Sequence, residues 1–140
     1  MMSHLVLDTN IILDVLVFEE ERCHPLRTAL QQGRIRLFAT QDMRAELVRV
    51  LDYPNIKKRR DQRQLSIPHV LSQFDNWVDW CEPAPKVGFT CKDPDDQCFL
   101  NLAAQQQCAL ISKDEAVLTM RKRMATVGVM VHDVWTDPAP

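Results

Sequence analysis

The chain has 140 residues, a length that fits one domain of ordinary size, and its hydrophobic share of 46% is enough to form a core. The net charge of -2 argues against tight non-specific binding of nucleic acid through a large basic surface, although it leaves room for a local basic patch. With only 3 glycines, the sequence has no phosphate-binding loop of the GxGxxG or P-loop kind.

The apolar segments and the cysteines predict a cytosolic protein. The longest apolar stretch, Ile11 to Phe18, is too short to span a membrane and contains Asp14. No signal peptide precedes it, so we expect a cytoplasmic protein without a membrane partner. The 5 cysteines are odd in number and include no CxxC pair, which predicts reduced thiols rather than disulfides or a zinc site.

The first part of the chain alternates strand and helix patterns. His4 to Leu7 is a short run of strand-forming residues, and a helical apolar pattern follows from Asn10 to Phe18. A second helix is predicted from Cys23 to Gln32, ending before a glycine suited to its C-terminal cap. The run Ile35 to Phe38 predicts a second strand.

Helices dominate the middle of the chain. Thr40 suits the N-cap of a helix that should run to about Tyr53, because a proline follows. A very basic stretch, Lys57 to Arg63, comes next. Another helix opens at Ser66, and its apolar face extends to Cys81.

The last part of the chain returns to alternating elements. Glu82 to Thr90 is predicted to be a loop around a weak strand, and Asp93 with Pro94 should open a helix that ends near Gln107. The remaining predicted elements are a buried strand from Cys108 to Ile111, a helix from Asp114 or Glu115, a last strand from Val127 to Val131, and a loose tail from about residue 136.

This alternation predicts an α/β fold with a mainly parallel sheet and right-handed crossovers. The helices between Thr40 and Cys81 form an insertion-like pair between the second and third strands. No internal linker divides the chain, so we expect a single domain over residues 1–140.

Several carboxylates follow the predicted strands. Asp8 ends the first strand, and Asp114 follows the buried run that ends at Ile111. The other candidates, near helix starts, are Glu46, Asp93, Asp95 and Asp96. Ligands of open parallel sheets bind beyond the carboxyl ends of the strands, so we expect these side chains to meet there.

Such a cluster predicts a site for a hard metal ion. One pair of carboxylates at about 4 Å costs on the order of 4 kcal/mol at an effective dielectric of about 20. Several of them therefore need a cation or raised pKa values. Oxygen ligands without histidine or cysteine suit Mg²⁺ or Mn²⁺, which can activate a water for attack on a phosphodiester.

Each acidic residue also has an ordinary structural explanation. Asp93 and Asp95 can serve only to cap or charge a helix start, and Asp114 can be a cap as well. Glu46 lies on an amphipathic helix, where an isolated glutamate is usually solvated. Asp8 fits such an explanation least, because it ends a buried strand.

Four segments together resemble the PIN-domain family. In chain order they are Val6-Leu7-Asp8-Thr9-Asn10, the helical Arg44 to Leu51 with its acidic residue, Asp93 to Ala103, and Leu110-Ile111-Ser112-Lys113-Asp114. Their order and spacing fit over nearly the whole chain. The Asp-Pro-Asp-Asp form of the third segment resembles the toxin components of bacterial toxin–antitoxin systems, with VapC-like toxins as broader relatives.

The resemblance implies a three-layer PIN-like fold, often dimeric, and cleavage of single-stranded RNA with Mg²⁺ or Mn²⁺. The expected partners are an RNA substrate, an antitoxin protein and a second copy of the chain. By resemblance the catalytic and metal-binding set is Asp8, Glu46, Asp96 and Asp114, with supporting hydrogen bonds from Thr9, Asn10 and Ser112. Asp96 is preferred to Asp93, the reserve candidate, because it stands 18 residues before Asp114, as in related toxins. The chain has Ser112-Lys113-Asp114 where the family usually has Thr-Gly-Asp or Thr-Arg-Asp, so the hydroxyl is kept.

Basic and aromatic residues suggest contacts with RNA. Lys57, Lys58, Arg59 and Arg60 are candidates to neutralise backbone phosphates, against the simpler explanation of a solvated helix face. Trp77 and Trp80 are candidates to stack on bases, although the apolar spacing of Trp77 favours a core position.

Two other functions compete with a ribonuclease. One is a catalytically idle PIN-like module that binds RNA or a protein, against which the four intact acidic positions argue. The other is a hard-metal phosphohydrolase for small phosphates, and it lacks support because Asn10 replaces the second aspartate of an Asp-x-Asp opening.

Overall fold

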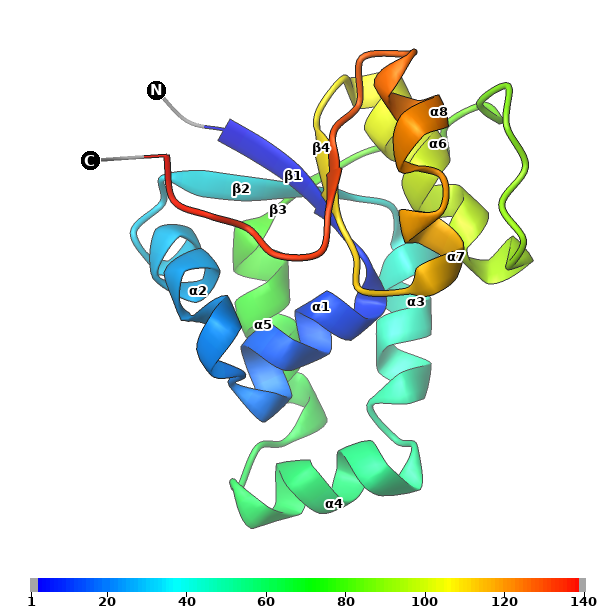
Figure 1. Ribbon diagram of the computed structural model, residues 1–140. Coiled ribbons are helices and arrows are strands. Elements are labelled where there is room, and N and C mark those ends of the chain that lie inside the picture. The colour runs from blue at the N-terminus through cyan, green and yellow to red at the C-terminus, as the bar shows by residue number, and fades with distance from the viewer. Residues whose placement is uncertain (1–2, 139–140) are drawn as a thin grey trace.

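The computed structural model describes residues 3–138, and its strands form one sheet in the order β3-β2-β1-β4-β5 (Figure 1). The strands are β1 (Ser3–Leu7), β2 (Ile35–Ala39), β3 (Val78–Trp80), β4 (Ala109–Ile111) and β5 (Val131–His132). Every neighbouring pair is parallel, which confirms the predicted α/β fold. β1 lies in the centre, and its Leu5, Val6 and Leu7 are all buried because both faces of the sheet are covered.

Helices cover the sheet in a three-layer arrangement. They are α1 (Thr9–Leu13), continued by a π-helical turn (Asp14–Phe18), α2 (His24–Gln31) after a 3-10 turn (Glu21–Cys23), α3 (Gln41–Val50), α4 (Pro54–Gln62), α5 (Ile67–Trp77), α6 (Gln97–Gln106) after a 3-10 turn (Pro94–Asp96), α7 (Glu115–Leu118) and α8 (Arg121–Ala125). Figure 1 shows α1, α2 and α5 on one side of the sheet and α6, which contacts β1, β2 and β4, on the other. Among the described residues, no helix combines the length and the apolar character needed to cross a membrane.

The third strand was predicted at the wrong place. We expected a helix up to Cys81 and a weak strand within Glu82–Thr90, but α5 ends at Trp77, the strand is Val78–Trp80, and residues 82–90 contain none. Parallel pairing with β2 overrides the helical spacing of the apolar residues in this segment.

The region between β2 and β3 holds three helices instead of the predicted pair. α3 ends at Val50 rather than near Tyr53, and Pro54 starts α4 instead of only ending the helix before it. Proline suits this first position, because the backbone N–H that it lacks would have no partner inside the helix.

The last strand is shorter than predicted. We expected Val127–Val131, but the strand begins only at Val131. Gly128 adopts a φ of +83°, and the backbone N–H of Val129 donates to Met124 O, so residues 127–130 turn the chain out of α8. Of the predicted tail, residues 136–138 have no helix or strand, although Arg34 pairs with Asp137 at 3.0 Å, and Pro140 lies outside the described residues.

Arg60 corrects the prediction that four consecutive basic side chains contact RNA. Its side chain is buried, and its guanidinium donates to Leu51 O at 2.9 Å and to Leu65 O at 3.1 Å. Arg60 therefore joins the two ends of the α4 segment and has no free face for a phosphate. Lys57, Lys58 and Arg59 are exposed on the same helix.

Replacement of Arg60 should destabilise the fold. In Arg60→Met the carbonyls of Leu51 and Leu65 lose their donors, so we expect a loss of about 1–3 kcal/mol in the free energy of unfolding, measured by urea denaturation. The matched control is Arg59→Met, one position earlier and exposed, with an expected change within about 0.5 kcal/mol. Equal effects of the two substitutions would contradict the structural role of Arg60.

Candidate metal centre

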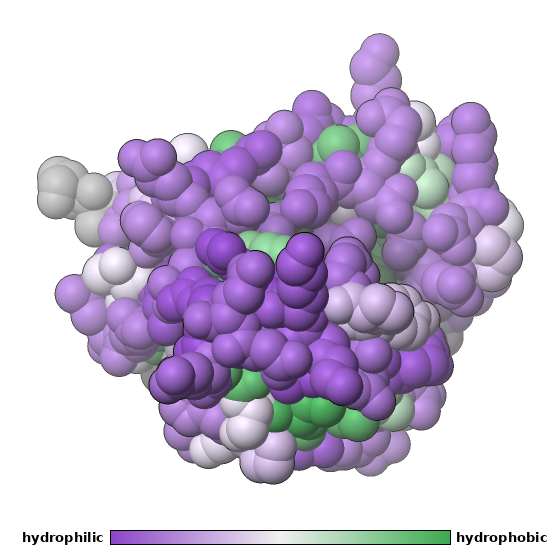
Figure 2. Space-filling model, turned by 90° about the horizontal axis from the view of Figure 1, so that it is seen from below, coloured by the Kyte–Doolittle hydropathy of each residue, from purple (hydrophilic) through white to green (hydrophobic). Residues whose placement is uncertain are grey.

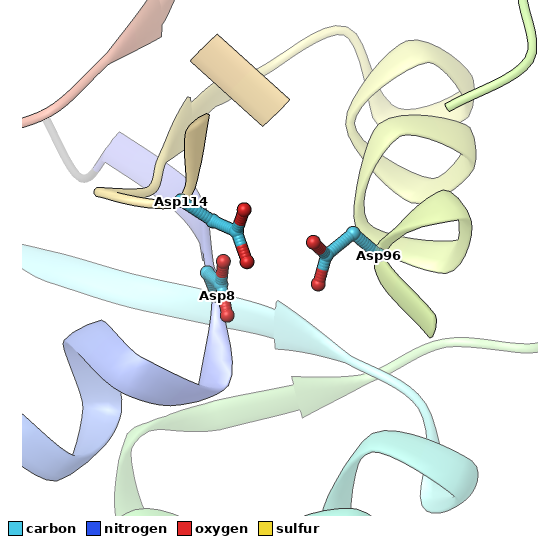
Figure 3. A group of neighbouring side chains, drawn as sticks. All are labelled: Asp8, Asp96 and Asp114. Carbon is cyan, nitrogen blue, oxygen red and sulfur yellow. The ribbon is translucent and has the colours of Figure 1, made fainter. Parts of the chain in front are cut away.

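Three aspartates meet at the carboxyl edge of the sheet. Asp8 follows β1, Asp114 lies shortly after β4, and Asp96 ends the 3-10 turn that leads into α6. One carboxylate oxygen of each lies within 4.8 Å of the others. Figure 3 shows the three side chains pointing toward one another from different elements. This acidic triad brings together residues that are far apart in the sequence.

Asp8 is held in place from two sides. It is the N-cap of α1, where its Oδ1 accepts from the backbone N–H of Asn10 at 3.3 Å. Its Oδ2 accepts from the hydroxyl of Ser112 at 2.6 Å. Asn10 therefore contributes through its backbone, and Ser112 through its side chain.

Ser112 also positions the second member of the triad. The backbone N–H of Asp114 donates to Ser112 Oγ at 3.1 Å, and Asp114 in turn caps α7 by accepting from the N–H of Ala116. Ser112 is completely buried, so its hydroxyl exchanges no hydrogen bond with solvent. The ends of β1 and β4 are thus joined through one hydroxyl.

Asp96 is the least satisfied member of the triad. Its residue is only 7% exposed, and its Oδ2 is buried without a hydrogen-bond partner. An unpaired buried carboxylate oxygen is unfavourable, and native proteins rarely keep one without a reason. A cation between the three carboxylates would supply the missing partner.

Burial, together with the neighbouring carboxylates, raises the pKa of two members of the triad, Asp8 and Asp96. Burial raises the pKa of Asp8 despite the hydrogen bond from Ser112. Burial also raises the pKa of Asp96 to about 8, with further contributions from the charge of Asp8 and from Asp114. Near neutral pH the metal-free site therefore holds a proton that a divalent cation would displace.

The donor set fits Mg²⁺ or Mn²⁺ better than a soft metal. The triad offers only carboxylate oxygens, which are the ligands that these ions prefer. No histidine or cysteine belongs to this group among residues 3–138.

Glu46 and Asp93 lie outside the triad. Glu46, on α3, accepts from Thr9 Oγ1 at 2.9 Å and lies 3.7 Å from Arg49, and its charge contributes to the raised pKa of Asp8. Asp93 caps the 3-10 turn by accepting from the backbone N–H of Asp95 at 3.0 Å. Of the two alternatives for the third aspartate, the structure brings Asp96 to Asp8.

The exposed basic residues of α4 are not part of this group. Figure 1 shows α4 at the base of the molecule, apart from the ends of β1 and β4. Figure 2 views the molecule from below, the side on which α4 lies, and shows a mostly hydrophilic surface that includes a small apolar patch.

One ion pair beside the triad was not predicted from the sequence. Lys113 Nζ lies 2.7 Å from Asp14 Oδ2, and Asp14 is buried in the π-helical turn after α1. A charged residue inside the apolar run Ile11–Phe18 was the available signal, because a buried charge needs a partner. This pair fixes the segment between Ser112 and Asp114 against α1.

The chain matches the model of a known protein family. A family model described as PIN domain matches residues 4–116 of the chain. No curated protein matches it. The matched range includes Asp8, Glu46, Asp96 and Asp114.

Stability of the metal-free protein should fall as the pH rises. Between about pH 4 and about pH 8 the folded chain keeps the proton of Asp96 while the unfolded chain releases it, so the folded state binds more protons and loses stability with increasing pH. We expect Asp96→Asn to be more stable than the wild type at pH 8 by at least about 1 kcal/mol, measured by urea denaturation with EDTA.

The control for this experiment is Asp95→Asn, an exposed neighbour that should keep the wild-type profile. A residual slope in Asp96→Asn is expected from Asp8, whose pKa is also raised. Identical pH profiles for the wild type and Asp96→Asn would rule out the raised pKa of Asp96.

Proposed function

The chain belongs to the PIN-domain family, and from this premise we propose that it is a metal-dependent endoribonuclease that cleaves single-stranded RNA. One observation carries the proposal: three aspartates converge, and Asp96 among them keeps a buried oxygen without a partner. A cluster of like charges without a function would only destabilise the fold. A metal site explains why the three carboxylates lie together.

Asp8, Asp96 and Asp114 would hold the Mg²⁺ or Mn²⁺ ion. When bound, such an ion lowers the pKa of a water molecule and neutralises charge on the phosphodiester. Ser112 and the N–H of Asn10 keep both oxygens of Asp8 oriented for this role. Loss of such a supporting hydrogen bond typically lowers metal affinity or activity by about 10–100-fold.

We assign Glu46 the role of proton acceptor. The hydroxyl of Thr9 donates to Oε2 of Glu46, and Oε1 of Glu46 lies 3.7 Å from the guanidinium of Arg49. These contacts hold the carboxylate beside the triad and not within it. In the proposed reaction a water oxygen bonds to phosphorus, the water proton passes to Glu46, and one P–O ester bond breaks. The leaving oxygen takes a proton from solvent.

The proposed biological role is the toxin of a toxin–antitoxin pair in the cytoplasm. The segment Asp93-Pro94-Asp95-Asp96 supports this role by its resemblance to such toxins. An antitoxin protein would be the main partner, and a homodimer is the proposed assembly. A small neighbouring reading frame encoding a DNA-binding protein would support the role further. Lys57, Lys58 and Arg59 remain candidates for contacts with the RNA backbone, since all three are exposed.

Metal binding should depend on Asp96 and not on Asp93. We expect calorimetry with MnCl₂ to show one tight site in the wild type and a loss of affinity of about 10-fold or more in Asp96→Asn. Asp93→Asn is the matched control, because asparagine also caps a helix and the residue lies outside the triad. Loss of Mn²⁺ binding in Asp93→Asn alone would reverse the assignment, and no binding in the wild type would favour a catalytically idle module.

Cleavage should require Asp8. With Mn²⁺ we expect the wild type to cut single-stranded RNA and Asp8→Asn to be slower by more than about 100-fold, with an unchanged circular dichroism spectrum. Ser112→Ala should lose about 10–100-fold, because Asp8 is then less well oriented.

The control is Asp61→Asn, an exposed position on α4, with activity expected close to that of the wild type. Full activity of Asp8→Asn would contradict the proposed active site. Turnover of nucleotides but not of RNA would instead assign the site to small phosphates.

A further inference from the structure

A groove extends from Glu46 along the first turns of α3. It consists of three adjoining cavities that all include Asp42. The cavity beside Glu46 and Arg49 has a volume of about 320 Å³, a narrow one of about 70 Å³ follows, and the last one, of about 210 Å³, reaches Trp80. We call this feature the α3 groove.

The α3 groove lies on the same edge of the sheet as the acidic triad. Trp80 ends β3, which is separated from β1 by β2 alone. Neighbouring strands are about 4.8 Å apart, so the end of β3 lies roughly 10 Å from that of β1 along this edge. Stacked nucleotides rise about 3.4 Å each, so a strand with its phosphate at the triad would reach Trp80 within a few nucleotides.

Trp80 has the properties of a stacking surface. It is 41% exposed, although most large hydrophobic residues of the chain are buried. Its ring packs against Phe74 at 6.2 Å in an edge-on arrangement, which fixes it on the end of a strand. Stacking on nucleic-acid bases requires such a rigid, exposed aromatic ring, and every base offers a face for it.

The charges of the groove favour bases over phosphates. Asp42, Glu82 and Asp95 are exposed carboxylates along it, and the single basic lining residue, Arg49, lies at the triad end beside Glu46. Carboxylates repel phosphates but accept hydrogen bonds from the amino groups of bases. Cytosine, adenine and guanine carry such an amino group, whereas uracil has none.

We propose that the α3 groove binds bases of the substrate strand, stacks one of them on Trp80 and prefers bases with an amino group at that position. The proposal rests on the proposed nuclease function and adds a substrate subsite to it. The backbone of the strand then faces solvent, with Arg49, 64% exposed in its side chain, next to the phosphate nearest the triad.

Binding can be tested apart from catalysis by tryptophan fluorescence. Short oligodeoxycytidine is titrated into the protein with Ca²⁺, and quenching is followed in the wild type, Trp80→Phe and Trp77→Phe. We expect quenching in the wild type and in Trp77→Phe, the partly buried neighbour, and its loss in Trp80→Phe. Quenching that persists in Trp80→Phe would overturn the proposal, as would quenching by an arginine-rich peptide but not by the oligonucleotide.

Selection of the base is tested by kinetics with short RNAs that carry cytosine or uracil in turn at each of the first few positions from the cut, because the base on Trp80 lies a few nucleotides away from it. Trp80→Ala should raise KM by about 10-fold with a smaller change in kcat, while Tyr53→Ala, an exposed aromatic outside the groove, should leave both unchanged. Glu82→Gln should reduce the preference for cytosine.

The two proposals fail in different ways. RNA cleavage with a KM that Trp80→Ala does not change would overturn the groove and leave the nuclease intact. Trp80-dependent quenching without any cleavage would support the groove and overturn the nuclease.

Discussion

The hydroxyl of Ser112 joins the two carboxyl-bearing segments on which the site depends. It donates to Asp8 and accepts from the backbone N–H of Asp114, so the ends of β1 and β4 are held together although their side chains repel. The repulsion between two like charges at about 4 Å is on the order of 4 kcal/mol near a protein surface. This exceeds the net stabilisation that one hydrogen bond contributes. The remaining stabilisation must therefore come from the packing of the strands, and β1 is buried in the centre of the sheet.

A second connection holds the same region from the other side. Asp14 lies in the π-helical turn after α1 and pairs with Lys113, which stands between Ser112 and Asp114. The segment after β4 is thus fixed to β1 through Ser112 and to the end of α1 through Lys113. Asp96 approaches from the 3-10 turn before α6, and no hydrogen bond holds its Oδ2. A rigid frame with one unsatisfied ligand is the arrangement expected of a metal site that keeps room for water and substrate.

Residues of one type have opposite roles in this molecule. Arg59 is exposed on α4, whereas Arg60 is buried and donates to two carbonyls. Trp77 ends α5 and is partly buried, whereas Trp80 opens onto the α3 groove. A basic stretch or a pair of tryptophans therefore does not mark a nucleic-acid surface by itself. The side of the helix or strand on which each residue lies decides its role.

The sequence by itself determined the features that depend on neighbours in the chain. Apolar runs predicted β1, β2 and β4, and the predicted N-cap residues Thr40, Ser66, Asp93 and Asp114 all accept the expected backbone hydrogen bonds. Such hydrogen bonds span two or three residues, so they can be recognised locally. Only the tertiary structure decided that Val78–Trp80 is a strand and that Arg60 is buried. It also brings to Asp8 the residue that the family resemblance preferred, Asp96 rather than Asp93. The bond between Ser112 and Asp8 joins residues 104 positions apart, and contacts of this kind form only when the sheet brings distant segments together.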